Sequence, residues 1–299
     1  MKIINCWRSF GIRKSLSFGC RQYDICLNFS SYLKFKRPES KLITMKLDTP
    51  QFRAIFTPEV NKLSELFQKY GHGLRLAGGA VRDLLMNKQP EDIDFATTAT
   101  PDEMKQMFTT EGVRMLHRKG EMHGTVTVRI NDQQNFEITT LRIDMRTDGR
   151  HAEVEFTTNW ELDAGRRDLT INAMFLGLDG TLYDYFNGKE DLEKRAVRFV
   201  GHPEGRIKED YLRILRYFRF YGRIALNPND HDAHTLEAIR NNAEGLSQIS
   251  GERLWMELKK ILGGNFAKEL ILQMIDLGIG PFIGNFLAIL LINESVHNN

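Results

Sequence analysis

The chain has 299 residues, 41% of them hydrophobic and 27% charged, the balance of an ordinary soluble globular protein with room for two or three domains. The net charge of +2 is unevenly spread: residues 1–46 carry ten Lys or Arg against two acids, so the remainder carries 31 basic and 37 acidic side chains and is not a generally basic nucleic-acid binder. All three cysteines, Cys6, Cys20 and Cys26, lie in that basic segment, which excludes disulfides, a cysteine nucleophile and zinc–thiolate sites from the rest of the chain.

Residues 1–45 form a basic leader that is rich in Arg, Lys, Ser and aromatic residues and nearly free of acids. The leader lacks the continuous apolar core of a secretory signal, so we interpret it as a mitochondrial transit peptide, with a disordered basic tail as the alternative. Met45 would serve as a second start for a cytosolic or nuclear form. No stretch reaches the roughly 18–20 apolar residues that span a membrane, so no membrane partner is expected.

Residues 46–202 mix helical and strand patterns, which predicts an α+β head. The expected elements, in chain order, are a helix over 57–71, a strand over 74–78, a helix over 80–86, a strand over 92–96, a helix from 101 capped by Thr100, paired strands over 124–130 and 135–141, a further strand over 151–156, a helix over 166–178 and a turn-rich connector over 179–192.

After residue 203 the pattern becomes purely helical. Amphipathic helices are predicted within 206–224, 231–246 and 250–264, so residues 203–278 are interpreted as a helical neck and the start of a body. Residues 279–299 form a divergent apolar tail.

Two aspartates, Asp92 and Asp94, are separated by one residue on a predicted strand. Residues two apart on a strand share a face, so both carboxylates would project together while Ile93 faces the core. Hard oxygen ligands placed in this way suit Mg²⁺, and a pair of such ions activates an attacking hydroxyl and stabilises a leaving pyrophosphate. The alternative is a pair of solvated acids at the end of a strand.

A glycine pair, Gly78 and Gly79, precedes those aspartates by about a dozen residues. Glycine allows a sharp turn that approaches a phosphate closely, and the start of the next helix offers free N–H donors. Arg82, one turn further on, would add a charge-assisted contact. A plain turn is the alternative for the glycine pair alone, but its combination with the paired aspartates favours a nucleotide site.

The segment 165–174 supplies further candidates. Arg166 and Arg167 are adjacent and suit phosphate binding, and Asn172 would hydrogen-bond a ribose hydroxyl. Asp168 completes an Arg-Arg-Asp motif. The alternative is a charged helix start with no ligand.

Asp210, Arg213, Arg216 and Arg219 recur every three residues, which on one helix gives a slowly drifting stripe. Such a stripe is usually a solvated face. Asp210 and Arg213, however, have opposite hydrogen-bonding roles, because a carboxylate accepts and a guanidinium donates. Cytosine and adenine each present an amino donor beside a ring-nitrogen acceptor, so this pair would accept C and A and refuse U and G.

Four motifs in this order, GGAVRD followed by DIDFATTAT, GRRDLTINAM, DGTLYDYFNGKEDL and EDYLRILRYFRF, resemble those of the class II tRNA nucleotidyltransferases, the CCA-adding enzymes, and in particular their eukaryotic mitochondrial and cytosolic form. The match runs from about residue 46 to about residue 275.

This resemblance implies a polymerase-β-like nucleotidyltransferase head with a small mixed sheet, followed by a helical neck and a truncated body. It implies template-independent addition of C, C and A to the 3′ end of tRNA from CTP and ATP. Asp92 and Asp94 match metal ligands of a two-Mg²⁺ site. Nucleotide contacts are matched by Gly79, Arg82, Arg167, Asp210, Arg213, Arg216 and Arg219.

The resemblance also implies a flexible loop over 112–125 that is needed for the final A, with Glu121 as a contributor, and Glu137 as a possible third active-site acid. The tail departs from the family pattern, which suggests a truncated or alternatively spliced product with less tRNA-gripping surface. Three alternatives stay open: a poly(A) polymerase, an enzyme that adds only CC, and an inactive truncation that binds nucleotide or a partner.

Overall fold

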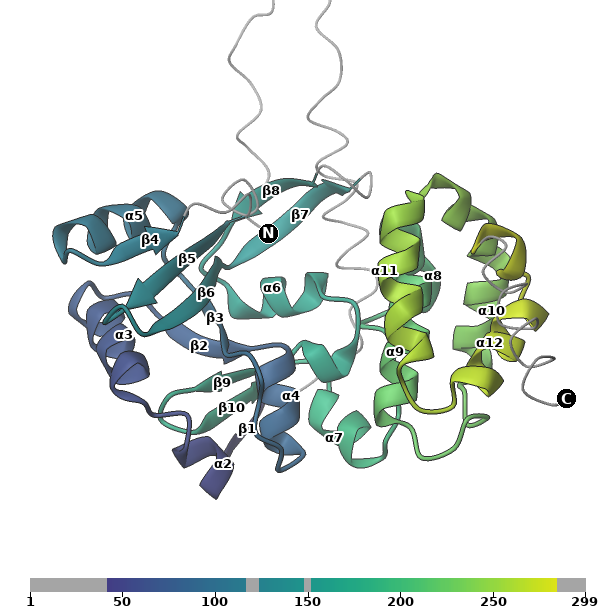
Figure 1. Cartoon of the computed structure of the whole chain (residues 1–299), viewed down its shortest axis with the longest axis horizontal. Coiled ribbons are helices and arrows are strands. Elements are labelled where there is room, and N and C mark those ends of the chain that lie inside the picture. The colour runs from purple at the N-terminus through teal and green to yellow at the C-terminus, as the bar shows by residue number, and fades with distance from the viewer. Residues whose placement is uncertain (1–41, 117–123, 148–151, 284–299) are drawn as a thin grey trace, which may run out of the picture. The chain divides into compact units, whose positions relative to one another are not determined.

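The computed structural model describes residues 42–116, 124–147 and 152–283 (Figure 1). Residues 1–41 of the basic leader, the loop residue Glu121 and most of the apolar tail therefore lie outside the described residues. The described residues all belong to one compact unit that begins at Glu39. The proposed division between head and neck at residue 202 stays a prediction.

The head is built on a mixed sheet of eight strands in the order β1-β10-β9-β2-β3-β6-β5-β4. Neighbouring strands run antiparallel except β3 and β6, which are parallel. The strands are β1 (Ile43–Lys46), β2 (Leu74–Ala77), β3 (Asp94–Thr97), β4 (Arg114–Leu116), β5 (Thr125–Ile130), β6 (Gln134–Thr140), β9 (Phe175–Gly177) and β10 (Thr181–Asp184). A separate hairpin pairs β7 (Arg142–Thr147) with β8 (Ala152–Phe156). The α+β prediction is confirmed.

Helices close one face of the sheet over the main core. α3 (Pro58–Lys69) begins at its cap Thr57 and buries its apolar stripe, and α5 (Pro101–Thr110) begins at a capping box formed by Thr100 and Glu103. Phe95 and Phe136, from neighbouring strands, are buried in that core in edge-to-face contact. Asp94 and Glu137, each adjacent in sequence to one of these phenylalanines, therefore project from the opposite face of the sheet.

The predicted helix over 166–178 is wrong. α6 (Trp160–Arg166) ends where it was expected to begin, because Arg167 takes an extended backbone conformation. A short 3₁₀ turn, η2 (Thr170–Asn172), then leads into β9, which lies in the middle of the sheet. A strand that is buried on both faces is a continuous apolar run, and such a run has no period to separate it from a buried helix.

The chain after residue 203 is helical in its described part, as predicted. The helices are α8 (Pro203–Glu209), α9 (Arg213–Ile224), α10 (Ala233–Asn242), η3 (Ala243–Gln248), α11 (Gly251–Leu262), α12 (Ala267–Asp276) and η4 (Gly280–Phe282). Figure 1 shows α9 and α11 side by side, and their contacts confirm the packing. No helix among the described residues is long and apolar enough to cross a membrane.

Two boundaries differ from the sequence-based expectation. Residues 206–224 do not form one helix, because the backbone is extended at Asp210 between α8 and α9. At the other end, β1 begins at Ile43 and pairs with β10 at the edge of the sheet. The leader boundary placed at residue 45 thus falls inside a strand. The short helices α2 (Pro50–Arg53), α4 (Gly79–Leu85) and α7 (Gly188–Glu193) complete the head.

Candidate active site

Three acids gather on the face of the sheet opposite the main core. Asp94 is the first residue of β3 and lies directly opposite Glu137 of the parallel strand β6. Asp92 lies two residues before β3, in the bend that leads into it, so the two predicted aspartates do not share one strand. They still act on each other: partial burial, then the charges of Glu137 and Asp92, raise the pKa of Asp94, and Arg167 opposes the rise. The structure thus brings Glu137 to the predicted pair.

The glycine turn lies between β2 and α4. Gly78 has φ 63° and ψ −122°, a conformation that favours glycine, and Gly79 is the first residue of α4. Arg82 is buried, and its Nη1 donates to the Asn172 side-chain oxygen at 2.9 Å, while Nε and Nη2 donate to Asp83. Two predicted nucleotide contacts, Arg82 and Asn172, therefore bind each other across 90 residues of sequence.

Arg166 and Arg167 end α6 and share one buried partner, Asp163. Arg166 donates from Nε at 2.8 Å, and Arg167 donates from Nε at 3.2 Å and from Nη2 at 3.1 Å. The Nη1 atom of Arg167 lies 3.5 Å from the place that a Cβ at Gly78 would occupy. Arg167 therefore stands over the glycine turn and is close enough to Asp94 to affect its pKa.

The proposed base-reading pair lies at the junction of α8 and α9. Asp210 accepts the Leu212 N–H on one carboxylate oxygen and the Nη2 of Arg253, from α11, at 3.1 Å on the other. Arg213 is buried and donates to Glu209 at 2.7 Å and to the Arg166 carbonyl at 3.2 Å. The two residues remain three apart around a turn closed by the Arg213 N–H and the Asp210 carbonyl.

The remaining two arginines of the stripe have acidic partners rather than a solvated face. Arg216 donates to the buried Asp168 of the head at 2.6 Å. Burial of Asp168 works against its ionisation, but Arg216, and then Arg213, hold its pKa below the ordinary value. Arg219 binds both oxygens of Glu257 on α11 at 3.0 Å. These pairs join α9 to the head and to α11.

Comparison with known proteins shows the family to which the chain belongs. Residues 74–198 match the family described as the Poly A polymerase head domain, and residues 232–286 match the probable RNA and SrmB-binding site of polymerase A. The chain is 64% identical over 247 residues to the CCA tRNA nucleotidyltransferase 1, mitochondrial, of Homo sapiens, covering 83% of this chain and 57% of that protein. The chain belongs to the family of CCA-adding tRNA nucleotidyltransferases.

More distant members share the fold. The CCA-adding enzyme of Bacillus subtilis (strain 168) is 39% identical over 212 residues, which cover 69% of this chain and 50% of that enzyme. The crystal structure of the Bacillus stearothermophilus CCA-adding enzyme in complex with CTP superposes with a TM-score of 0.66 at 34% identity, over 78% of this chain and 53% of the other. The family's polymerase-β-like head followed by helices is thus confirmed. The chain spans about half the length of the relatives it matches.

Sequence reasoning missed several residues that hold this family member's site together. Asp163 precedes Arg166 and Arg167 by three and four residues, a spacing that brings side chains together on a helix. That signal was hidden because the helix was expected to begin, not end, at residue 166. Arg253 and Glu257 on α11 could not be found in this way, because their partners, Asp210 between α8 and α9 and Arg219 on α9, are distant in sequence.

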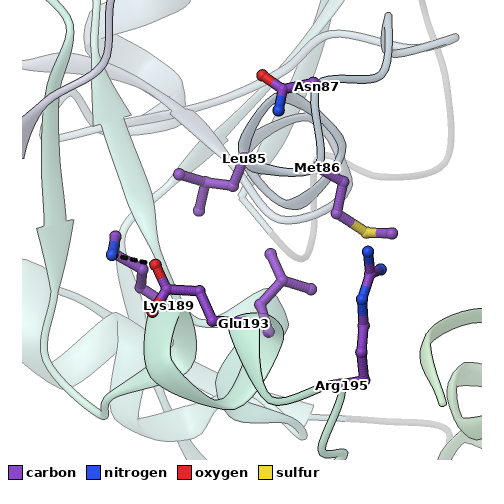
Figure 2. Close-up of a pocket in the computed structure, with 7 residues that line it drawn as sticks. Leu85, Met86, Asn87, Lys189, Glu193 and Arg195 are labelled. Atoms are coloured by element: carbon purple, nitrogen blue, oxygen red, sulfur yellow. Dashed lines mark hydrogen bonds and ion pairs between the residues drawn. The ribbon is translucent and has the colours of Figure 1, made fainter. Parts of the chain in front are cut away.

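A small cavity of about 210 Å³ lies elsewhere, between the end of α4 and α7 (Figure 2). It is lined by Leu85, Met86, Asn87, Lys189, Leu192, Glu193 and Arg195. Lys189 and Glu193 form an ion pair across one turn of α7. None of the predicted site residues lines this cavity.

Proposed function

We propose that this chain catalyses template-independent addition of C, C and A to the 3′ end of tRNA, using CTP and ATP. The observation that carries the proposal is the placement of Asp94 beside Glu137, with Asp92 and Arg167 within electrostatic reach. The relatives named for CCA addition support it. In the reaction, the terminal hydroxyl oxygen bonds to the α-phosphorus, the bond from that phosphorus to the bridging oxygen breaks, and pyrophosphate and a proton leave.

The acids fit Mg²⁺. No group of three or more His, Cys, Asp or Glu among the described residues lies close enough to hold an ion by itself. Mg²⁺ usually binds one or two carboxylates and completes its shell with water and substrate phosphates, which Asp92 and Asp94 can satisfy. Burial, and then the charges of Glu137 and Asp92, raise the pKa of Asp94, and a divalent cation would relieve the charge repulsion. When bound, Mg²⁺ would supply activation of the hydroxyl and neutralisation of the leaving pyrophosphate.

The chain's own residues bind and select the nucleotide. Arg167 stands over the Gly78–Gly79 turn and would contact the triphosphate. Arg82 and Asn172, which bind each other, would face the sugar and phosphates. Asp210 and Arg213 would read the base, one accepting from the amino group and the other donating to the ring nitrogen. Arg213 is also bonded to the Arg166 carbonyl, which links base reading to the phosphate side of the site.

A tRNA that lacks its 3′-terminal CCA tests the proposal. The chain is incubated with that tRNA and Mg²⁺, and CTP and ATP are offered separately and together. Addition of two C residues with CTP and of a final A with both is expected. A-only extension would indicate a poly(A) polymerase, and CC without A a CC-adding enzyme. No extension, with CTP still bound, would indicate a nucleotide-binding protein and contradict the proposed activity.

We also propose that the basic leader directs the chain to mitochondria. The support is its composition and the word mitochondrial in the names of the human, mouse and zebrafish relatives. A form started at Met45 would lack the leader and stay outside the organelle. Imaging of the tagged full chain and of the tagged form from Met45 tests both statements.

A further inference from the structure

We propose that Asp163 is a positioning residue for nucleotide binding, because it fixes the guanidinium of Arg167 over the glycine turn where the triphosphate would lie. The inference rests on the proposed function, which takes Arg167 as a triphosphate contact. Asp163 itself would not touch the substrate, since only 1% of its side chain is exposed.

Both carboxylate oxygens of Asp163 are committed to neighbouring groups. Oδ2 accepts Nε and Nη2 of Arg167 at 3.2 and 3.1 Å. Oδ1 accepts Nε of Arg166 at 2.8 Å and the backbone N–H of Arg142 at 3.1 Å. Two N–H donors of one guanidinium on the same carboxylate oxygen hold its Nε–Nη2 edge in place.

The rest of the Arg167 guanidinium faces the site. Its Nη1 donates to the Asn172 carbonyl at 3.1 Å and lies over Gly78. Its central carbon lies 4.8 Å from the centroid of the buried Phe175 ring, which supports it from the sheet. Asp163 thus holds the Nε–Nη2 edge of the guanidinium and leaves Nη1 beside the glycine turn.

The neighbouring acids explain why such a hold matters. Arginine is a long side chain with many rotamers, and Arg167 already lies within electrostatic range of Asp94. If Asp163 lost its charge, Arg167 would still be attracted to Asp94, one of the carboxylates proposed to bind metal. Asp163 therefore keeps the cation available to the triphosphate and away from the acids.

The test compares binding of CTP and of cytidine to the full chain in Mg²⁺ by isothermal titration calorimetry. Asp163→Asn should weaken CTP binding about tenfold, the loss of one oriented charged contact, and leave cytidine binding within about twofold. Asp163→Glu keeps the charge but displaces it by one methylene, and should give an intermediate loss. In an Arg167→Ala background, Asp163→Asn should cause no further loss of CTP affinity, because its effect passes through Arg167.

Asp191→Asn is the matched control. Asp191 is another buried carboxylate of the head, and it accepts hydrogen bonds from Arg198 at 2.9 Å and from the Thr170 hydroxyl. Its variant therefore measures the general cost of breaking a buried pair. It should lower stability and leave the CTP-to-cytidine affinity ratio unchanged.

Each outcome decides the inference. If the ratio of CTP affinity to cytidine affinity is unchanged in Asp163→Asn but reduced in Arg167→Ala, the role of Asp163 is overturned and the proposed function stands. Equal loss of CTP and cytidine affinity would show a merely structural role. Unchanged CTP binding in both variants would overturn the triphosphate role of Arg167 and the inference together.

Discussion

Asp94 and Glu137 occupy directly opposed positions on the parallel strands β3 and β6, and burial, followed by the charge of Glu137, raises the pKa of Asp94 above its ordinary value. These strands form the only parallel pairing in the eight-stranded sheet of the described residues. Like charges placed in this way disfavour ionisation of both carboxyls, and a bound cation would offset that cost.

Replacing Asp92 or Asp94 by Asn should abolish nucleotide addition without loss of stability. For an acid whose pKa is higher in the folded chain than in the unfolded chain, ionisation costs stability at neutral pH, so Asp94→Asn should hold or raise the melting temperature. Incorporation of labelled CTP and thermal unfolding measure the two effects. Asp102→Asn, at an exposed acid on α5, is the control, and near-normal incorporation by Asp94→Asn would refute the metal site.

Base choice should depend on Asp210 and Arg213. Losing one complementary hydrogen bond costs roughly 1–3 kcal/mol, or about 5- to 150-fold in discrimination. Single-nucleotide incorporation by Asp210→Ala and Arg213→Ala, with CTP, ATP, UTP and GTP offered one at a time, measures the ratio. Arg219→Ala should lower stability without changing the CTP-to-UTP ratio, because Arg219 is bound to Glu257. If neither of the first two variants changes the ratios, base selection is made elsewhere.

The Asp168–Arg216 pair should contribute to the attachment of α9 to the head. Asp168→Asn leaves Arg216 without its buried partner, and we expect a loss of about 3 kcal/mol in the free energy of unfolding in urea. Lys208→Ala, which breaks a pair on the surface of α8, should change stability little. Equal losses of unfolding free energy in the two variants would show that the buried Asp168–Arg216 pair stabilises the fold no more than a surface pair does.

Stability should fall below about pH 6.5 through His231. Burial lowers the pKa of His231, partly opposed by a hydrogen bond to the Pro228 backbone and then by the charge of Asp230, and the His231 ring stacks on Tyr221 with centroids 3.7 Å apart. Its stabilising contribution is full above the unfolded pKa of about 6.5 and is lost as the pH falls through the lowered folded pKa, because only the unfolded chain gains the proton at first. The free energy of unfolding, measured in urea titrations between pH 7 and pH 5, should change less steeply with pH in His231→Gln than in the unaltered chain. An unchanged slope would contradict the assignment.

Deletion of residues 1–41 should leave the fold intact, whereas deletion of residues 1–44 should lower the melting temperature. The longer deletion removes Ile43 and Thr44 from β1, which pair with Asp184 and Tyr183 of the next strand. Thermal unfolding of the two forms measures the difference. Identical melting temperatures would show that β1 adds nothing to the sheet.

The sequence by itself determined the elements whose signals are local. Thr57 and Thr100 mark helix starts because capping is a property of a few adjacent residues, and the alternation of β6 follows from one buried face. The glycine turn before the paired aspartates also indicated the nucleotide site, because the backbone conformation of Gly78 is a local requirement.

Tertiary structure alone decided what joins these pieces. The pairings of Arg82 with Asn172, Arg216 with Asp168 and Arg219 with Glu257 span 38 to 90 residues, and no local pattern encodes such contacts. Burial explains why the helix predicted over 166–178 was wrong. β9 lies between two strands inside the sheet, and its apolar run has no period that would distinguish a strand from a helix. The parallel pairing of β3 with β6 placed Glu137 beside Asp94, because strand register depends on the whole sheet and not on either strand.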